Sequence, residues 1–522
     1  MNKIWESVKN NKKKELIAVL FAFIAISVIF YYASPNIADP DGFYHLKHAQ
    51  IYKDNGIFFK NFPWVQYSSI SALKSDLWYG FHILLIPFSG IDSASGIKTA
   101  GIFLTVISLF ALWLVFKRTG YRFAFLWVML IFLSAPNIMT RFFMLRPHLI
   151  TMVISAIILS FLIRGKAIWI LVLSAFLAWI HISMAWIALL VLGTVFILKV
   201  GIEKEWIWKK SFAVLAGIAV GVLARPNPVG SLKLAYIQII KLLQAKQEDA
   251  ILLFGSEIFP LKWYTLAENF LAFTILWAVS ILIFFAFYKK YFRQDSAEKK
   301  IFISSNLTLS VLFFAMTMLT ARRAHDFWVI FGAMMIAGVL HSIISRKYSN
   351  DFIKTAFVSL LAVVFVFLAF YTPYKSLSTL RSRGTPPDTF KKASMWLKEN
   401  SNSKDIVFNM HWSDFPMLFF WNKKNYYIGG MDPIFQYSYS SPLYWKFHYL
   451  SSDQVTKKTC GATACTIEML EDTYFVLKNE FEAKYIVLQK YVNPAVYQYL
   501  NSDTEHYEKK LDLDPESVFL IK

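Results

Sequence analysis

Charged side chains are scarce in this chain of 522 residues: Asp, Glu, Lys and Arg together make up 17%, whereas hydrophobic residues make up 56%. Soluble globular proteins carry about 25% charged residues. This scarcity, together with a mean hydropathy of +0.45, excludes a soluble enzyme. It predicts a polytopic α-helical membrane protein.

Cysteine is almost absent as well, since the chain holds only Cys460 and Cys465, in the segment Cys-Gly-Ala-Thr-Ala-Cys. Two cysteines alone make a poor metal site. Outside the cytoplasm, a pair this close favours a short-loop disulfide over two free thiols.

Long apolar stretches, in contrast, are abundant. About eleven are long enough, or nearly long enough, to cross a bilayer. They cover roughly residues 14–33, 98–116, 122–136, 148–163, 167–181, 184–198, 211–224, 265–288, 301–319, 326–345 and 353–372. Several have only about 14–16 residues, so tilted, broken or re-entrant segments remain open alternatives.

Lysines and arginines alternate between the loops and so predict the orientation of the chain. Lys12, Lys13 and Lys14 lie at the start of the first stretch. Loops rich in basic residues remain in the cytoplasm, so these lysines place the N-terminus there. An odd number of spans then places the C-terminus outside the cytoplasm, in a cell or inner membrane. The net charge of +20 is divided among the loops, which favours contact with membrane lipid and excludes a nucleic-acid partner.

The middles of the apolar stretches are almost free of ionisable groups, and the unusual polar residues fall in loops on the outer side. These residues are Asp39, Asp41, His45, His48, Arg141, Arg146, His148, His181, Arg225, Asn227, Glu257, Arg322, Arg323, His325 and Asp326. A proton or ion pathway would place such groups within the spans. The pattern therefore predicts a functional site at the outer face.

The composition becomes that of a soluble domain after residue 371. We expect a membrane domain over 1–371 with an outer loop over 34–97, a linker over 372–387, and an extracytoplasmic α/β domain over 388–522. Within the last domain we predict helices at 389–398 and from 416, and strands at 406–409, 426–428 and 485–488.

Carboxylates and arginines near the outer face suggest the chemistry. Asp39, Asp41 and Glu257 are candidates to bind a divalent cation, and Arg322 and Arg323 are candidates to pair with phosphate oxygens in fork geometry. Mutual ion pairing at helix ends is the alternative for these residues. His148 has two equally good interpretations, a ligand or a hydrogen-bonded interfacial histidine.

Three segments carry a resemblance to a known family. Asp41-Gly42-Phe43-Tyr44-His45-Leu46-Lys47 resembles the first-loop Asp motif of GT-C class membrane glycosyltransferases. Gly255-Ser256-Glu257-Ile258-Phe259-Pro260 is similar to the Glu-containing loop of the catalytic subunit of oligosaccharyltransferase. His411-Trp412-Ser413-Asp414-Phe415 resembles the Trp-Trp-Asp-Tyr-Gly motif of that subunit. The three occur in the family's order, across most of the chain.

The resemblance implies roles for particular residues. Asp41, with Asp39 beside it, and Glu257 would be catalytic, and Mg²⁺ or Mn²⁺ would be held by Asp41, Glu257 and His148. The lipid-linked phosphate would meet Arg322 or Arg323, with Arg225 and Arg146 as further candidates. Trp412, Asp414 and His45 would contact the acceptor.

Two departures from the family pattern leave alternatives open. The region 137–148 has no acidic residue where the family carries Asp-x-Asp, so Asp39 or His148 would replace a ligand, or the enzyme would work without metal. The acceptor motif contains Trp-Ser-Asp-Phe-Pro, so the resemblance does not imply recognition of an Asn-x-Ser/Thr sequon.

The sequence thus predicts a GT-C-type glycosyltransferase that moves a sugar or oligosaccharide from a polyprenyl-phosphate or polyprenyl-pyrophosphate donor to a protein or envelope glycan at the outer membrane face. Two alternatives from other classes are a transporter or flippase of lipid-linked glycans and a noncatalytic assembly protein. A transporter predicts inverted repeats and polar residues near mid-span, and the sequence shows neither.

Overall fold

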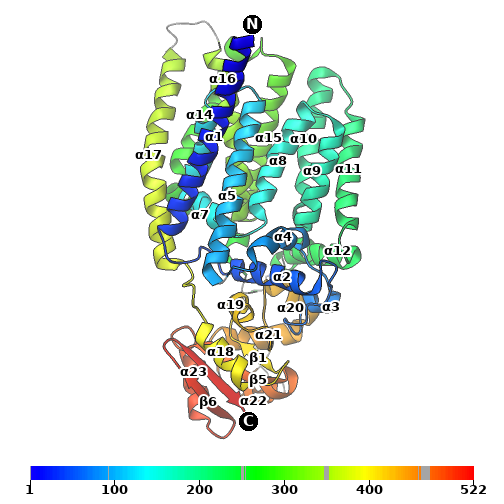
Figure 1. Ribbon diagram of the computed structural model, residues 1–522, viewed down its shortest axis with the longest axis vertical. Coiled ribbons are helices and arrows are strands. Elements are labelled where there is room, and N and C mark those ends of the chain that lie inside the picture. Colours follow the sequence, from blue (N-terminus) through cyan, green and yellow to red (C-terminus); the bar gives the residue numbers. More distant parts are fainter. Residues whose placement is uncertain are drawn as a thin grey trace. The chain divides into compact units, whose positions relative to one another are not determined.

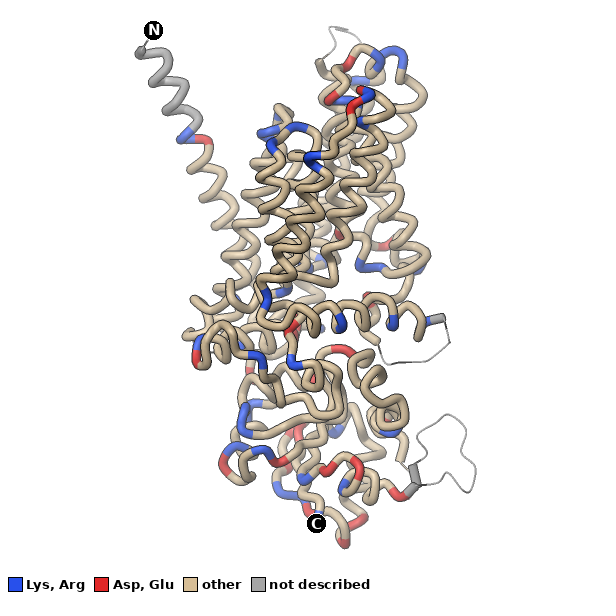
Figure 2. Tube along the Cα trace, turned by 90° about the vertical axis from the view of Figure 1, so that its right-hand side faces the viewer, with Lys and Arg blue, Asp and Glu red and all other residues tan. Residues whose placement is uncertain are grey.

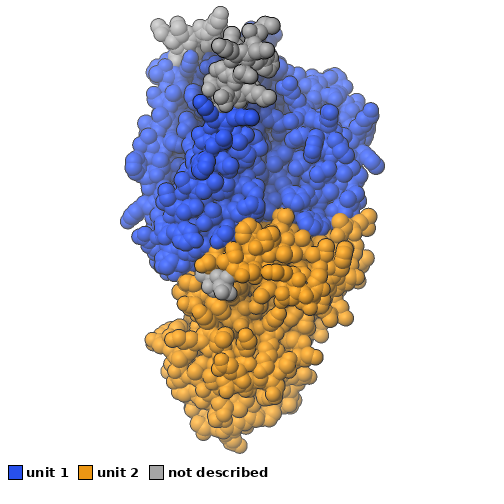
Figure 3. Space-filling view, in the orientation of Figure 1, with its two compact units in different colours: residues 1–38, 98–221, 256–384 blue, residues 39–97, 222–255, 385–522 orange. Residues whose placement is uncertain are grey.

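The chain divides into two compact units, each assembled from discontinuous segments (Figure 3). The computed structural model describes residues 2–91, 93–247, 252, 254–345, 352–455, 458–459 and 471–522. Unit 1 comprises residues 1–38, 98–221 and 256–384, and unit 2 comprises residues 39–97, 222–255 and 385–522. Each unit is described by itself below.

Unit 1 is a bundle of helices that run side by side (Figure 1). Its principal helices are α1 (Asn2–Tyr32), α5 (Ser93–Arg118), α6 (Ala124–Leu133), α7 (Pro136–Phe143), α8 (His148–Ile163), α9 (Ala167–Ile180), α10 (Trp186–Glu203), α11 (Trp208–Leu223), α14 (Trp263–Ala286), α15 (Ala297–Leu319), α16 (His325–Ile344) and α17 (Phe352–Arg383). Short helical turns η2 (Ile182–Met184), η4 (Ser256–Ile258), η5 (Tyr288–Phe292) and η6 (Arg322–Ala324) connect them.

In the described part of the chain, seven helices are long and apolar enough to cross a membrane, or up to nine if each of two bent pairs forms one span. The eleven predicted stretches fall on these seven helices, on the two bent pairs and on the shorter apolar helices α8 and α9. The chain is therefore an integral membrane protein. The span count is lower than eleven because α8 and α9, with 16 and 14 residues, are shorter than the about 20 residues that cross a bilayer.

Lysine, arginine and acidic residues are sparse along the middle of these helices (Figure 2). Hydrocarbon offers no hydrogen-bond partner for a charged side chain, so an apolar helix surface is the stable one in lipid. The arginines and carboxylates of unit 1 that the sequence singles out lie instead near helix ends.

A sharp break separates α6 from α7, whose axes are bent by 97°. Pro136 restricts the preceding residue to extended backbone, and Ala135 has φ −161° and ψ 151°. Helix ends leave carbonyl oxygens without intrahelical partners. At the end of α6, Thr372 Oγ1 of α17 supplies such a partner to the Leu133 carbonyl at 2.7 Å. Ser376 Oγ of the same helix donates to the carbonyl of Pro136, the first residue of α7, at 3.1 Å.

The same α17 contacts correct one expectation. Residues 372–383, expected as part of a linker over 372–387, continue α17 to Arg383. Thr372, Ser376 and Leu380 are buried and lie on one face of that helix. Their spacing of four residues places the three side chains on one buried face of the helix. Packing of this face favours a continuous helix through Pro373, although the Pro, Ser and Gly content predicts a turn.

Unit 2 contains a five-stranded mixed sheet of order β2-β1-β5-β7-β6. The strands are β1 (Ile406–Asn409), β2 (Tyr426–Tyr427), β5 (Ala483–Gln489), β6 (Tyr507–Asp512) and β7 (Glu516–Ile521); β3 (Lys458–Thr459) and β4 (Glu471–Asp472) form a separate pair. β1 runs parallel to β2 and β5, and β7 runs antiparallel to β5 and β6. The predicted strands at 406–409, 426–428 and 485–488 are confirmed.

Helices surround this sheet and extend unit 2 beyond it. They are α2 (Asp41–Asn55), α3 (Ser69–Leu73), α4 (Tyr79–Leu85) followed by η1 (Ile86–Phe88), α12 (Pro228–Tyr236), η3 (Ile237–Lys241), α13 (Leu242–Gln247), α18 (Lys391–Asn400), η7 (Trp412–Asp414), α19 (Phe415–Trp421), α20 (Pro433–Tyr439), α21 (Ser441–Ser451), α22 (Thr473–Phe475), η9 (Val476–Glu480) and α23 (Pro494–Ser502).

The first loop and the C-terminal segment share unit 2 because their aromatic residues pack together. The ring centroids of Phe43 on α2 and Phe420 on α19 are 5.3 Å apart, and Val65 forms a β-bridge with Tyr427. The boundaries proposed at residues 371 and 388 stay a prediction. Cys460 and Cys465 lie outside the described residues.

Candidate functional site

Four chain segments of unit 1 bring guanidinium and carboxylate groups together. Arg141 lies in the last turn of α7, Arg146 lies in the turn before α8, Glu257 lies in η4, and Arg323 lies in η6 just before α16. All of these residues lie near helix breaks. Side chains at the end of a helix project away from the apolar faces of that helix. We call the group the arginine cluster: Arg141, Arg146, Glu257, Arg322, Arg323 and Asp326.

Both carboxylate oxygens of Glu257 accept from arginines. Arg323 Nη2 lies 2.9 Å and Arg146 Nη1 3.1 Å from Glu257 Oε1, and Arg141 Nη1 lies 2.9 Å from Glu257 Oε2. Arg141 also donates from Nε to Asp326 Oδ2 at 2.7 Å. One carboxylate therefore orients three guanidinium groups.

These contacts leave an excess of positive charge. Arg322 adds a fourth guanidinium, whose Nη2 donates to Ser256 Oγ next to Glu257. Four guanidinium groups against the carboxylates of Glu257 and Asp326 give a formal charge of about two positive units. Burial would raise the pKa of the Glu257 carboxyl, but the charges of Arg323, Arg146 and Arg141 outweigh it and hold that pKa well below its usual range.

His148, at the start of α8, offers unused hydrogen-bonding capacity beside these charges. It is buried, and neither Nδ1 nor Nε2 has a hydrogen-bond partner among the described residues. Arg323 Nε is likewise buried without a partner in that part of the chain. Buried polar atoms are normally satisfied, and exceptions point to a missing partner.

The arginine cluster suits an anion better than a cation. A divalent metal at Glu257 would have to displace arginines from both carboxylate oxygens and lie among three positive charges. A phosphate oxygen, in contrast, would accept from guanidinium groups in their preferred geometry. Whether Glu257 and His148 bind metal stays a prediction.

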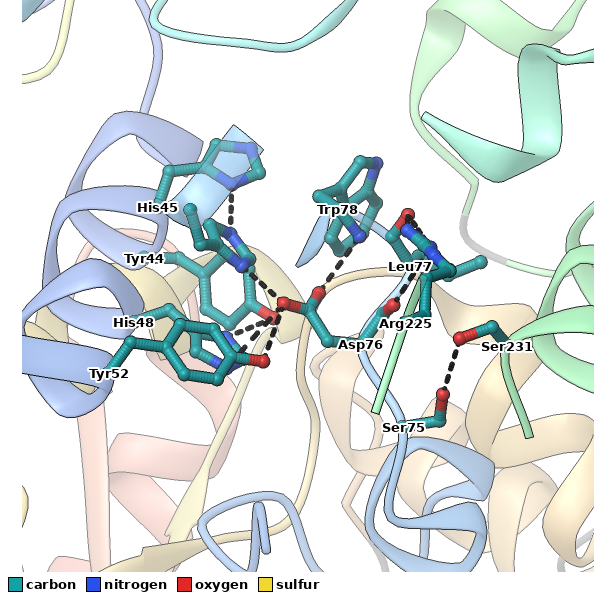
Figure 4. A network of polar contacts seen from close by, with 11 residues as sticks. Tyr44, His45, His48, Tyr52, Ser75, Asp76, Leu77, Trp78, Arg225 and Ser231 are labelled. Carbon is teal, nitrogen blue, oxygen red and sulfur yellow. Dashed lines mark hydrogen bonds and ion pairs between the residues drawn. The ribbon is translucent and has the colours of Figure 1, made fainter. Parts of the chain in front are cut away.

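A second polar network lies in unit 2, between α2, α4 and the turn before α4 (Figure 4). His82 Nδ1 lies 2.6 Å from Asp76 Oδ2, Tyr52 donates to the same oxygen at 3.1 Å, and the backbone N–H of Trp78 donates to Asp76 Oδ1 at 2.9 Å. His45, predicted as an acceptor contact, lies with Nδ1 2.8 Å from His82 Nε2.

His48 completes this network. Its Nε2 lies 3.8 Å from Asp76 Oδ2, and its Nδ1 lies 2.9 Å from the hydroxyl of Tyr44. The donor atoms of His48, Asp76 and His82 all lie within 4.8 Å of one another. These three residues are the metal-ligand candidates that geometry identifies among the described residues.

The remaining predicted residues of unit 2 lie near the start of α2 and in the turn after α11. Asp39 is buried just before α2, and Asp41 is the first residue of that helix. Arg225 is buried and donates from Nη2 to the Leu77 carbonyl at 2.7 Å. Its guanidinium thus holds the turn that carries Asp76.

The predicted acceptor motif forms η7 and the start of α19. Trp412 lines a small pocket with Asp432, Gln436 and Tyr444, and the buried Nε2 of Gln436 has no hydrogen-bond partner in the described part of unit 2. Asp414 is buried and accepts from the backbone N–H of His411 at 3.3 Å. Burial raises the pKa of the Asp414 carboxyl to about 7.

Sequence analysis missed three members of these sites. Arg141 and Asp326 were noted only as outer polar residues, since each lies beside an apolar run like many helix-end charges. Asp76 precedes the aromatic segment Leu77-Trp78-Tyr79, and aromatic residues also follow Asp41. The sequence pattern nevertheless does not single out Asp76. Only proximity in space joins these residues to their partners.

The helical bundle with an attached α/β domain is the fold of GT-C class membrane glycosyltransferases. The crystal structure of the Archaeoglobus fulgidus oligosaccharyltransferase tethered with an acceptor peptide is similar, with a TM-score of 0.61 and 14% identity over 95% of this chain and 72% of that chain. ArnT from Cupriavidus metallidurans in the apo state gives a TM-score of 0.53 and 10% identity over 96% and 97%.

The arabinofuranosyltransferase AftD from Mycobacteria also shares the fold, with a TM-score of 0.54 and 12% identity over 96% of this chain and 40% of that chain. No family model and no curated protein matches the sequence. The predicted GT-C fold with a C-terminal α/β domain is thereby confirmed.

Proposed function

We propose that this protein is a glycosyltransferase that moves a sugar or oligosaccharide from a polyprenyl-phosphate or polyprenyl-pyrophosphate to a protein or envelope glycan at the outer membrane face. The observation that carries the proposal is the arginine cluster. Its excess positive charge, at the ends of apolar helices and beside the unpartnered His148, suits a phosphate attached to a lipid.

Ligands of the similar structures support this kind of donor and acceptor. The Archaeoglobus oligosaccharyltransferase has been solved with an inhibitory peptide and a dolichol-phosphate, and ArnT with undecaprenyl phosphate. Fold similarity alone does not identify the substrate, so the donor and the acceptor are inferred from the residues of the site.

In the proposed donor site, Arg323, Arg146 and Arg322 contact the phosphate oxygens. Glu257 and Asp326 orient the guanidinium groups and keep part of their charge balanced. Arg225 is a weaker candidate, because its guanidinium already donates to backbone carbonyls. The charge that develops on the leaving phosphate is stabilised by donors fixed before the reaction.

The proposed transfer inverts the sugar carbon in one step. A carboxylate, Asp41 or Asp39, accepts the proton of the acceptor nucleophile, which forms a bond to the anomeric carbon. The bond from that carbon to the phosphate oxygen breaks, and its electron pair leaves on the polyprenyl phosphate or pyrophosphate. The phosphate needs charge neutralisation and no protonating acid.

We propose acceptor contacts by Trp412 and Asp414, with His45 as a further candidate. The pocket beside Trp412 contains the unpartnered amide of Gln436, which can donate to an oxygen of the acceptor. Mg²⁺ or Mn²⁺ held by Asp41 is compatible with this transfer, which does not require a metal.

The test is consumption of polyprenyl-linked sugars, extracted from native membranes, by the purified protein with and without a chelator. Wild type should consume donor, whereas Asp41→Asn and Glu257→Gln should lose at least about 100-fold in turnover. Glu268→Gln is the matched control, since Glu268 forms an exposed pair with Lys375.

Donor consumption that persists in both variants would show that the assigned site is wrong. No consumption by wild type, even with a crude envelope fraction as acceptor, would favour the transporter or the assembly protein. Loss of activity with chelator that Mg²⁺ or Mn²⁺ restores and Zn²⁺ does not restore would support a metal at Asp41.

A further inference from the structure

We propose that His48, Asp76 and His82 of unit 2 form a zinc site that ties helix α2 to the turn preceding α4. Two imidazoles and one carboxylate are typical Zn²⁺ ligands, whereas Mg²⁺ prefers oxygen ligands throughout. The proposal concerns a position other than the arginine cluster and does not depend on the proposed reaction.

The distances between the ligand atoms are close to those around zinc. Asp76 Oδ2 lies 2.6 Å from His82 Nδ1 and 3.8 Å from His48 Nε2. Ligands about 2.0–2.1 Å from a tetrahedral ion lie about 3.3–3.4 Å apart. The third distance, between the histidine nitrogens, is within 4.8 Å, so side-chain shifts of about 1 Å would place all three atoms around one ion.

Each proposed ligand is held by a second contact on its other polar atom. His82 Nε2 lies 2.8 Å from His45 Nδ1, His48 Nδ1 lies 2.9 Å from the Tyr44 hydroxyl, and Asp76 Oδ1 accepts from the Trp78 N–H at 2.9 Å. These contacts leave one further polar atom on each of the three side chains, and those atoms lie within 4.8 Å of one another. Figure 4 shows His48 and Asp76 on neighbouring segments of this network. Metal-bound histidines and carboxylates in proteins show this same arrangement.

Packing also fixes the rings in advance. His48 stacks on His82 with ring centroids 4.2 Å apart and on Phe62 at 4.7 Å. His48 and His82 are buried, and a preformed ligand set loses little conformational entropy when it binds an ion. The Tyr52 hydroxyl, 3.1 Å from Asp76 Oδ2, or a water would take the fourth position.

A buried carboxylate is stabilised by a nearby cation. Arg225, the arginine of this network, donates to the backbone carbonyls of Asp76 and Leu77 and not to the Asp76 carboxylate. Zn²⁺ would add positive charge beside the Asp76 carboxylate, which His82 contacts at 2.6 Å, and would hold α2, the helix that begins at Asp41. A network of hydrogen bonds alone is the alternative that the experiment must exclude.

The test measures metal content and thermal stability of the full-length protein, purified in detergent with a tag that contains no histidine. Zinc would be counted by inductively coupled plasma mass spectrometry after equilibration with a small excess of ZnCl₂ and removal of free ion. The variant His48→Asn retains a group at the position of Nδ1 for Tyr44 but removes the ligand atom. Asp76→Asn is a second variant, and His506→Asn, at the more exposed pair with Asp503, is the control.

We expect wild type and His506→Asn to hold one zinc equivalent more than His48→Asn and Asp76→Asn. Zinc should raise the thermal midpoint of wild type by at least about 3 °C and leave that of His48→Asn unchanged. Equal zinc content in wild type and His48→Asn, or no zinc-dependent shift in wild type, would overturn the proposal. Neither readout requires glycosyl transfer, so its failure is separate from a failure of the proposed function.

Discussion

At the scale of single residues, the neighbours of a carboxylate decide its charge. Glu257 and Asp414 are both largely buried acids, yet Glu257 faces three guanidinium groups and Asp414 accepts mainly from the His411 backbone. The arginines hold the pKa of Glu257 well below its usual range despite burial, while burial raises that of Asp414 to about 7. Glu257 is therefore an ionised orienting group, and Asp414 is largely neutral below pH 7.

Replacement of single arginines should weaken donor binding. Arg323→Gln and Arg146→Gln each remove a charged donor to a phosphate oxygen, a contact worth about 1.5–3 kcal/mol. We expect the donor KM to rise about 10- to 150-fold with a smaller change in kcat, measured with extracted polyprenyl-linked sugar. Arg164→Gln, at an exposed loop position, is the control. Unchanged donor KM in both variants would place the phosphate site elsewhere.

Asp414 should make stability depend on pH. Between pH 3.8 and about 7, native Asp414 keeps a proton that the unfolded chain has released. The native state then binds more protons than the unfolded state, so this group's contribution to the free energy of unfolding falls as the pH rises through that window. Asp414→Asn should flatten the decrease in thermal midpoint between about pH 4 and 7. Parallel curves for wild type, Asp414→Asn and the exposed control Asp388→Asn would contradict it.

At the scale of elements, helix ends and breaks position the arginine cluster. The last turn of α7 carries Arg141, and the Phe142 carbonyl in that turn accepts from Thr105 Oγ1 at 2.7 Å and from Tyr31 at 3.2 Å. At the break before α7, side chains of α17 donate to the carbonyl of Leu133, the last residue of α6, and to that of Pro136, the first residue of α7. Neighbouring helices thus hold the short α7 by contacts at both of its ends.

Removal of one such contact should loosen α7. Thr372→Val keeps the shape of the side chain but leaves the buried Leu133 carbonyl without its donor, at a cost of about 1–3 kcal/mol. We expect a lower thermal midpoint and reduced turnover, because Arg141 depends on α7 for its position. Thr379→Val is the control on the same helix, since Thr379 donates within α17 to the Lys375 carbonyl. Equal midpoints for the two variants would show that the contact with Leu133 contributes little.

At the scale of the whole molecule, each of the two units is built from three separate segments of the chain. Unit 1 supplies the apolar helices and the arginine cluster, and unit 2 combines the first loop with the C-terminal sheet. The alternation of basic loops predicts that the C-terminal sheet of unit 2 lies outside the cytoplasm.

This orientation is testable by labelling with a membrane-impermeant maleimide. In a background of Cys460→Ser and Cys465→Ser, Glu505→Cys should be labelled on intact cells or spheroplasts. Lys166→Cys, in a predicted cytoplasmic loop, should be labelled only after permeabilisation. The physical reason is that basic loops are retained in the cytoplasm during insertion. The reverse labelling pattern would invert the predicted topology and remove the proposed site from the outer face.

Hydrophobic length and periodicity are local properties, so the amino-acid pattern predicts the membrane class, the position of the apolar helices and the strands around Ile406, Tyr426 and Tyr485. It also identified Arg146, Glu257 and Arg323 individually. Only the tertiary structure joined them through Arg141 and Asp326, set Asp76 between His48 and His82, and extended α17 beyond residue 372. Those outcomes depend on contacts between residues far apart in the chain. No local sequence pattern predicts the burial and the charge environment of these residues.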